Sequence, residues 1–183
     1  MKNNQLFQSL KMFNRCWQII LLVLIPTQLW SQEPAGKVLV GWVERISIAD
    51  TAYSMKTKLD TGAKTSSIHA IDIEQFKRDG ERWVRFILPL EEMDGTPYLL
   101  KMEKRRKRRI SVKEHQGENS RRPVVELPIC FNGKRYEVEF SLIDRSKFIY
   151  PALLGRRFLS GVAVVDSEST FLTQSTCEQH HEE

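Results

Sequence analysis

The residues Asp60, Thr61, Gly62 and Ala63 form a stretch whose types and order could support chemistry by a carboxylate. The run 53–60 alternates apolar and polar residues, which predicts a strand that ends at Asp60. The glycine lets the backbone turn tightly, and the Thr61 hydroxyl can hold the corner by hydrogen bonding. A carboxylate presented at such a corner is what an aspartic peptidase needs. An ordinary turn built from common turn residues is the alternative.

Aspartic-peptidase catalysis requires two facing carboxylates that share one proton. Two close like charges cannot both ionise easily, so one carboxyl stays protonated and polarises the scissile carbonyl, while the other takes a proton from water. This chain has one Asp-Ser/Thr-Gly motif, because Asp94, Asp144 and Asp166 stand in other contexts. We therefore expect a symmetric homodimer in which each subunit supplies Asp60.

Leu153, Leu154, Gly155 and Arg156 form a second motif at the end of an apolar run. In retroviral-type aspartic peptidases, Asp-Thr-Gly-Ala is similarly followed by an apolar pair, Gly-Arg and a short helix. Over residues 41–172 the chain resembles a bacterial retropepsin-like family, RimB-like and often labelled ATP-dependent zinc proteases, that is associated with peptide ligases adding glutamate. The matching stretches are GWVERISI, KLDTGAKTSSIHA, DGERWVRF, SRRPVVELPI, DRSKFIYPALLGRRFL and VVDSE.

The resemblance implies a closed pepsin-half β-barrel, the acid-protease fold, with one short helix. It makes Asp60, Thr61 and Gly62 the expected catalytic corner, with Ala63 supporting it. Other positions characteristic of the family, to which the sequence alone assigns no chemistry, are His69, Arg122, Asp144, Arg145, Leu154, Gly155 and Arg156.

The residues do not support the zinc or the ATP in the family's label. The sequence has no His-Glu-x-x-His motif, His69 stands alone in a predicted strand, and His180 and His181 lie in a polar terminal segment. It also has no glycine-rich phosphate loop ending in Gly-Lys-Ser/Thr. We therefore expect neither a cofactor nor a metal.

The elements that must position the two motifs are nearly all strands. Asn132 and Gly133 between alternating runs predict a hairpin with a type I′ turn. We expect strands within 37–48, 53–60, 65–73, 78–90, 121–131, 134–144 and 161–167, and a helical turn within 155–161. Strands with closely spaced turns predict an all-β chain that forms a small barrel or sandwich.

The 183 residues fit one domain preceded by an export signal. A basic start (Lys2, Lys11 and Arg15) leads into the apolar run 16–25, which is shorter than the ~20 residues of a membrane span. Removal of residues 1–31 lowers the formal charge from +5 to +2, since three basic and no acidic residues are lost. We expect a signal peptide (1–31), a linker (32–36), a β domain (37–173) and a polar C-terminal tail (174–183). The protein would be periplasmic or held in the cell envelope without a stable membrane span, and an uncleaved anchor is the alternative.

Cys130 and Cys177 are the two cysteines of the expected mature chain. They could pair in an oxidising compartment or remain unlinked thiols. The sequence alone leaves both states open.

The segment 101–122 carries ten Lys or Arg residues against three Glu. It is either a solvated, flexible loop or a patch that faces an anion. Because it contains no aromatic residue to stack on bases, and because the protein is expected to be exported, nucleic acid is not an expected partner. If the patch borders the cleft it would favour acidic peptides, with Arg105, Arg106, Arg108 and Arg109 as the candidate substrate-binding residues.

A retropepsin-like site also needs a flap that closes over the substrate. The stretch 90–100, with Asp94 and Gly95 at its tip, is a candidate by position. An ordinary turn between two strands is the alternative.

Three functions fit these features. The first is an aspartic endopeptidase in which two Asp60 carboxylates of a homodimer activate water, with acidic or glutamate-rich peptides as the expected substrates. The second is a non-catalytic retropepsin-like envelope module that binds an anionic partner through 101–122. The third is a β-barrel adaptor in which Asp60 only makes a turn.

Overall fold

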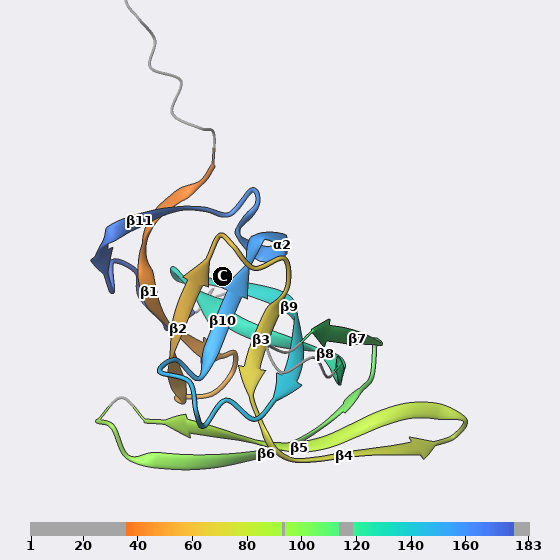
Figure 1. Cartoon of the computed structure of the whole chain (residues 1–183). Helices are drawn as coiled ribbons and strands as arrows, with labels where there is room; N and C mark the ends of the chain where they lie inside the picture. The colour runs from red at the N-terminus through yellow and green to blue at the C-terminus, as the bar shows by residue number, and fades with distance from the viewer. Residues whose placement is uncertain (1–35, 93, 114–118, 178–183) are drawn as a thin grey trace, which may run out of the picture. The chain divides into compact units, whose positions relative to one another are not determined.

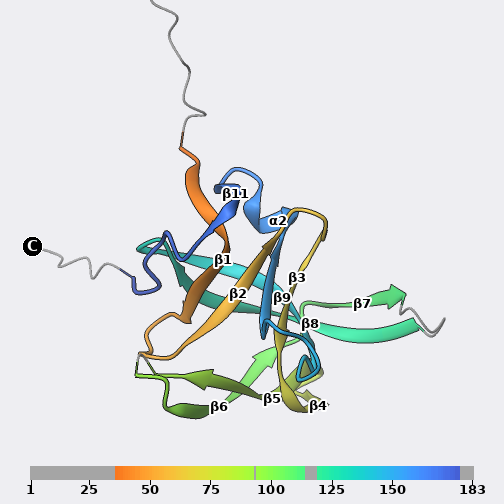
Figure 2. The same ribbon diagram turned by 60° about the vertical axis from the view of Figure 1, so that its left-hand side comes forward.

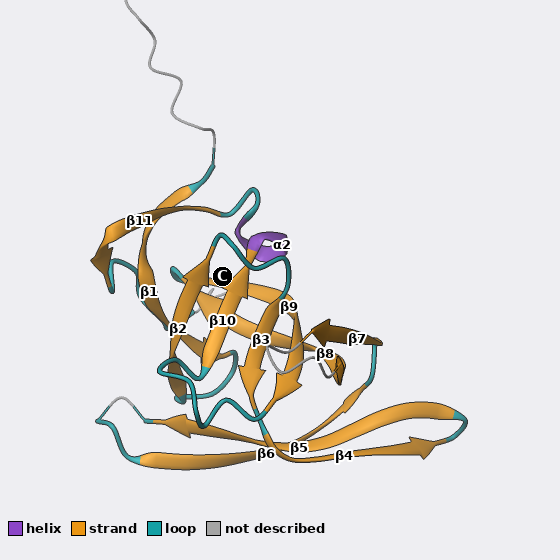
Figure 3. Ribbon diagram, in the orientation of Figure 1, coloured by secondary structure: helices purple, strands orange, loops and turns teal. Residues whose placement is uncertain are grey.

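The computed structural model describes residues 36–92, 94–113 and 119–177, and this part of the chain is built almost entirely from strands (Figure 3). In chain order its elements are β1 (Val38–Ile48), β2 (Ser54–Asp60), β3 (Ser66–His69), β4 (Ile71–Arg78), β5 (Glu81–Glu91), β6 (Pro97–Arg105), β7 (Arg108–Lys113), β8 (Asn119–Phe131), β9 (Lys134–Ile143), β10 (Ala152–Gly155), α2 (Arg156–Leu159) and β11 (Ala163–Thr170). The expected signal peptide (1–31) lies outside the described residues. Within them, no helix has the length and apolar character needed to cross a membrane.

Six strands close into a barrel (Figures 1 and 2), in the order β1, β8, β9, β3, β10, β2 and back to β1. The ring closes at β1, which pairs with β2 from Val43 to Ser47 and with β8 through Ser47 and Ile48. A closed ring leaves no free strand edge, which protects the sheet from pairing with other chains. Within the described residues, the expected all-β barrel with one short helix is confirmed.

The strand β10 lies between β2 and β3 and is only four residues long. It runs parallel to β2, with Leu154 opposite Leu59 and Gly155 opposite Asp60. The sequence does not predict this strand, because four residues are too few to show alternation. Its position brings the second motif of the sequence directly beside the first.

Inward-facing side chains from all six barrel strands fill the interior. Because successive residues of a strand point to opposite faces, every second side chain enters the core. At 3% exposure or less these include Ile46, Leu59, Ile68, Leu127, Phe140 and Leu154. On α2, Phe158 packs edge-to-face against Phe131 and Tyr136, with ring centroids 5.5 and 5.3 Å apart.

The charged segment 101–122 is not a flexible loop where the structure describes it. Residues 101–105 belong to β6, 108–113 to β7, and 119–122 begin β8. β6 pairs with β5 along its whole length, and β7 pairs with β8. The pairing holds some of the basic side chains, such as Arg105 and Arg108, beside glutamates of neighbouring strands. Of the two alternatives, the flexible loop is therefore wrong for these described residues.

Residues 171–177 return to β1 and are tied to it. The buried Glu44 carboxylate accepts hydrogen bonds from the main-chain N–H groups of Gly41 (2.7 Å), Leu172 (2.9 Å) and Thr173 (3.1 Å), and from the Thr173 hydroxyl (2.9 Å). A disulfide joins Cys177 to Cys130 of β8, so the two cysteines pair. The beginning of the polar C-terminal segment is therefore fixed to the barrel.

Candidate active site

Asp60 is the last residue of β2, and its carboxylate lies outside the barrel core. Its neighbour Leu59 is buried at 3% exposure, so the alternation of the strand places Asp60 and Lys58 on the outer face. The chain turns at once after Asp60. Asp60 Oδ1 accepts hydrogen bonds from the main-chain N–H groups of Gly62 at 2.9 Å and Ala63 at 3.2 Å. The carboxylate therefore helps to build the corner on which it sits.

Gly155 allows β10 to cross directly behind the Asp60 corner. A Cβ at position 155 would come within 2.8 Å of the main-chain carbon and oxygen of Thr65, closer than real Cβ atoms approach backbone. The Gly155 N–H donates to the Ser66 hydroxyl at 3.2 Å, and the preceding Leu154 is fully buried. A side chain at position 155 is therefore excluded by the backbone of Thr65, and the buried Leu154 side chain fixes β10 to the barrel core.

Arg156 braces the same corner from the downstream side. Its main-chain N–H donates to the carbonyl of Ala63 at 2.9 Å. Its guanidinium donates to the carbonyls of Thr61 at 2.9 Å and Gly62 at 2.7 Å. One residue thus satisfies three carbonyl groups of the corner, which would otherwise need water. The two sequence motifs are therefore one structural unit.

Lys58 is a site residue that neither motif reveals. Its Nζ lies 3.2 Å from Asp60 Oδ2. Partial burial raises the pKa of Asp60, but the Lys58 ammonium and the N–H donors of Gly62 and Ala63 outweigh it, and the pKa lies below its usual value. In one subunit this carboxylate is therefore held in its ionised form. The only sequence signal for Lys58 is its place two residues before Asp60 on an alternating strand.

Arg145 is a buried cation that lies close enough to Asp60 for the two charges to interact. Its guanidinium donates to the Ser67 hydroxyl at 2.9 Å and to the main-chain oxygen of Tyr150 at 3.0 Å. Burial and the charge of Arg122 lower the pKa of Arg145, while the charge of Asp60 raises it. The field of Arg145 adds to that of the lysine and favours an ionised carboxylate at position 60.

His69 and Asp144 hold the start of the loop that carries Arg145. The Arg145 N–H donates to His69 Nδ1 at 2.8 Å, so this nitrogen is an acceptor and the ring proton is on Nε2. Asp144 Oδ1 approaches the same nitrogen at 3.5 Å, but accepts its hydrogen bond from the main-chain N–H of Ser146 at 2.8 Å. Both residues thus position Arg145.

The four arginines expected to bind substrate do not gather at Asp60. They bond to different partners on different strands: Arg105 to Glu81, Arg108 to Glu139, and both Arg106 and Arg109 to Gln75. The basic segment therefore does not form a single substrate surface. Only Arg108 comes near the corner loop.

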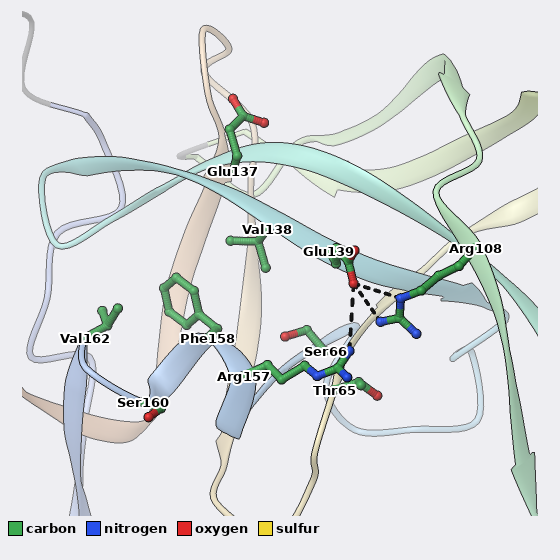
Figure 4. Close-up of a pocket in the computed structure, with 10 residues that line it drawn as sticks. All are labelled: Thr65, Ser66, Arg108, Glu137, Val138, Glu139, Arg157, Phe158, Ser160 and Val162. Carbon is green, nitrogen blue, oxygen red and sulfur yellow. Dashed lines mark hydrogen bonds and ion pairs between the residues drawn. The ribbon is translucent and has the colours of Figure 1, made fainter.

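A pocket of about 370 Å³ lies beside that loop, and Thr65 and Ser66 help to line it (Figure 4). Arg108 and Arg157 converge on the Glu139 carboxylate, at 2.6 and 4.0 Å. The remaining wall is formed by Glu137, Val138, Phe158, Ser160 and Val162. Asp60 itself does not line this pocket, so the pocket adjoins the candidate site but does not contain the reactive carboxylate.

The hairpin proposed as a flap does not cover Asp60 within one subunit. Glu91, at the end of β5, pairs with Ser54 at the opposite end of β2 from Asp60. Tyr98 of β6 stacks on Tyr53 just before β2, with ring centroids 3.7 Å apart. The β5–β6 turn is therefore anchored at the far end of the strand that carries the carboxylate.

No three His, Cys, Asp or Glu side chains come together to bind a metal in the part of the chain that the structure describes. His180 and His181 lie outside it. Among the described residues, Asp60, Lys58 and Arg145 are charged groups that interact with one another at the corner.

Comparison with known proteins agrees with this geometry. The model of the RimB-like family, described as "Retropepsin-like aspartic endopeptidase RimB", matches residues 39–176. A solved structure from Legionella pneumophila, of a protein with unknown function, superimposes with a TM-score of 0.61 at 29% identity, covering 75% of this chain and 98% of that one.

Curated relatives include two proteins named "Probable alpha-L-glutamate ligase". The one from Shewanella pealeana is 38% identical over 119 residues, 64% of this chain and 26% of the relative. The one from Desulfotalea psychrophila is 33% identical over 137 residues, 74% of this chain and 29% of the relative. The chain thus spans less than a third of the length of these relatives. The family model matches most of the chain, and the structure is a closed barrel that carries an Asp-Thr-Gly corner. The chain therefore belongs to the RimB-like family of retropepsin-like domains.

Proposed function

We propose that this protein is an aspartic endopeptidase whose site is completed by Asp60 of a second copy. The observation that carries the proposal is the construction of the corner. The Asp60 carboxylate is fixed by N–H groups of Gly62 and Ala63, while Arg156 and Gly155 brace the turn from behind. A carboxylate held this rigidly outside a barrel core is suited to meet its symmetry mate.

The proposed reaction is hydrolysis of a peptide bond by water held between the two carboxylates. The ionised Asp60 takes a proton as the water oxygen attacks the scissile carbonyl carbon, and the protonated Asp60 donates its proton to the carbonyl oxygen. The resulting gem-diol collapses with cleavage of the C–N bond. The Asp60 that took the proton of water gives it to the nitrogen, and a hydroxyl of the gem-diol returns a proton to the other Asp60. An amine and a new carboxyl group are released, and the pair again shares one proton.

Lys58 adds a condition to this mechanism. It holds the carboxylate of a single subunit ionised, which suits the base but not the acid. A second Asp60 brought close in a dimer adds a negative charge, and this repulsion raises the pKa of one member of the pair. The dimer would thereby create the protonated carboxyl that the isolated subunit lacks.

Acidic or glutamate-rich peptides are the proposed substrates. Lys58 and the buried Arg145 make the surroundings of Asp60 positive, which attracts negatively charged chains. Two of the relatives carry the name of a glutamate ligase, and a hydrolase acting on glutamate-containing peptides would have a related substrate.

We infer that the protein acts outside the cytoplasm, in the periplasm or the cell envelope. The disulfide between Cys130 and Cys177 supports this, because such bonds persist mainly in oxidising compartments. The basic, apolar start of the sequence is consistent with export. Nucleic acid is not among the proposed partners.

A non-catalytic module that binds an anionic partner is the second candidate. The Lys58–Asp60 contact favours it specifically, because a carboxylate neutralised by a lysine in its own subunit is poorly placed to share a proton. If the protein does not dimerise through this corner, the contact would serve only to stabilise the turn.

Peptide cleavage by the purified protein separates the two candidates. The wild type, Asp60→Asn and the matched control Asp79→Asn would be incubated with a peptide library that includes α- and γ-linked glutamate-rich members, with mass spectrometry as the readout. Asp79 is also an aspartate in a turn, at an exposed position between β4 and β5 and outside the flap candidate 90–100.

We expect the wild type and Asp79→Asn to cut the same peptides and Asp60→Asn to cut none. Equal cutting by Asp60→Asn would remove this residue from the mechanism. No cutting by any of the three proteins, with the fold and the dimer verified, would favour the binding module.

A further inference from the structure

A second basic site lies on the β4–β5–β6 meander, away from the Asp60 corner. It is a pocket of about 420 Å³, here called the arginine pocket, lined by Gln75, Phe76, Lys77, Arg82, Trp83, Arg106 and Arg109. In Figure 1 the meander lies below the barrel, whereas the corner lies at the upper end of β2. The arginine pocket is thus separate from the candidate active site.

The cations of the arginine pocket lack the carboxylate partners that their neighbours have. Arg78, Arg85, Arg105, Lys107 and Arg108 each form an ion pair with a glutamate. Lys77, Arg82, Arg106 and Arg109 form none with the described residues, and no acidic residue lines the pocket. Within 105–109, three basic residues therefore pair with glutamates, whereas Arg106 and Arg109 pair with none that the structure describes.

Gln75 occupies the place where a carboxylate would be expected. Its side-chain oxygen accepts a hydrogen bond from Arg106 at 2.8 Å and two from Arg109, at 2.9 and 3.2 Å. Two guanidinium groups that converge on one oxygen are the arrangement that proteins use for carboxylates and phosphates. A neutral amide leaves both positive charges available to an incoming anion.

The turn that carries Arg106 is held from both sides. The Arg106 N–H donates to the carbonyl of Arg82 at 2.8 Å, and the Lys107 N–H donates to the carbonyl of Val124 at 2.9 Å. Burial lowers the pKa of Arg106, and the charges of Arg109 and Arg82 lower it further. The fold therefore holds like charges together in a fixed geometry. An anion that binds there would be attracted by all of them, and the free energy needed to bring the charges together is already supplied by folding.

Phe76 and Trp83 are the aromatic residues of the pocket lining. They lie opposite each other in the strand pairing, next to the Gln75 pair, so strand alternation turns their side chains to the other face of the hairpin. There the Arg78 guanidinium lies over both rings, 5.2 and 4.9 Å from their centroids, so these side chains are not among the groups that would hold the anion. Sequence reasoning missed these aromatic residues because they come from the preceding hairpin and not from the basic segment.

We propose that the arginine pocket binds a multiply charged oxyanion, with the guanidinium groups of Arg106 and Arg109 as its main ligands. Both phosphate groups and the closely spaced carboxylates of an acidic peptide have this chemistry. Binding at this site does not require Asp60 and would occur whether or not the protein is a peptidase.

The test measures binding of pyrophosphate and of tri-glutamate to the purified full-length protein by titration calorimetry at constant ionic strength. The first variant is Gln75→Glu, which is nearly isosteric and places an internal carboxylate beside both arginines. The second is the double variant Arg106→Gln/Arg109→Gln. The control Lys101→Gln/Lys134→Gln removes the same charge from two exposed positions outside the pocket lining.

We expect at least one probe to bind the wild type and the control alike, and both pocket variants to weaken that binding by about tenfold or more. Preference for pyrophosphate would identify a phosphate site, and preference for tri-glutamate a docking site for acidic peptides. The proposal is wrong if neither probe binds, or if the control loses as much affinity as the pocket variants. Gln75→Glu keeps the test decisive if the double variant does not fold.

Discussion

Lys58 Nζ lies 3.2 Å from Asp60 Oδ2. Lys58 is two residues before Asp60, and both side chains are on the outer face of β2. This contact, together with the N–H donors of the corner, lowers the pKa of the carboxyl despite its partial burial. In the proposed mechanism a single subunit therefore presents only the base, and the acid of the shared-proton pair would arise from the approach of a second Asp60.

Lys58→Gln should raise the pKa of Asp60, because it removes the ammonium that stabilises the ionised form. If Asp60 is the base, the acid limb of the pH–rate profile should move to higher pH, because activity requires an ionised carboxylate. The pKa is measurable from the carboxyl carbon of Asp60 by NMR. Lys56→Gln, an exposed change on the same strand, is the control. An acid limb that does not move would exclude Lys58 from the electrostatics of the site.

The same contact has a consequence for stability. Since the folded-state pKa of Asp60 is below that of an unfolded Asp, about 3.9, its ionisation stabilises the fold above that pH, and this contribution is lost as the pH falls through the folded-state value. The difference in Tm between the wild type and Lys58→Gln should therefore shrink on acidification. A difference that grows below about pH 4 would contradict this sign.

Gly155→Ala should destabilise the barrel by roughly 1–3 kcal/mol, because the new Cβ would collide with the backbone of Thr65 and force the crossing strands apart. Urea unfolding measures the loss. Ser160→Ala, an exposed change at the end of α2, should cost less than about 0.5 kcal/mol. Equal stability of the two variants would mean that β10 does not pass this close to the corner.

Glu44→Gln should lower the free energy of unfolding by roughly 2–4 kcal/mol. The buried carboxylate accepts four hydrogen bonds, and the amide that replaces it turns an N–H₂ group toward donors. Denaturant unfolding gives the loss, and Glu137→Gln on an exposed part of β9 is the matched control. A loss of unfolding free energy no larger than that of the control would show that the Glu44 hydrogen bonds to 171–173 do not stabilise the fold.

Much of the fold could be predicted from local pattern. Alternation marks β2 and β8, and Asn132-Gly133 marks the hairpin between β8 and β9, because the interactions that define them are close in the sequence. β10 could not be predicted, since its four residues become a strand only between two partners far away in the chain. The place of the flap candidate 90–100 could not be predicted either, because sequence position does not reveal which end of β2 the hairpin joins.

Some residues of the candidate site could likewise be predicted from the sequence, and others could not. Asp60 could be identified from the chemistry of its own motif. Gly155 could be identified only through the resemblance to retropepsin-like proteins, because the backbone of Thr65 that requires a glycine there lies far away in the chain. Lys58 carries no motif, and the arginine pocket draws Gln75 and Trp83 from one hairpin and Arg106 and Arg109 from a later turn. Such groups depend on the register between strands, which one sequence does not display.

The central claim is that two Asp60 carboxylates, one from each subunit, form one active site. Wild type and Asp60→Asn would be mixed under conditions of subunit exchange, at constant total concentration, and the cleavage rate measured against the wild-type fraction. A shared site predicts a rate that falls as the square of that fraction, because only wild-type pairs have both carboxylates. A rate that falls in simple proportion would mean that each subunit works alone, and would contradict the account.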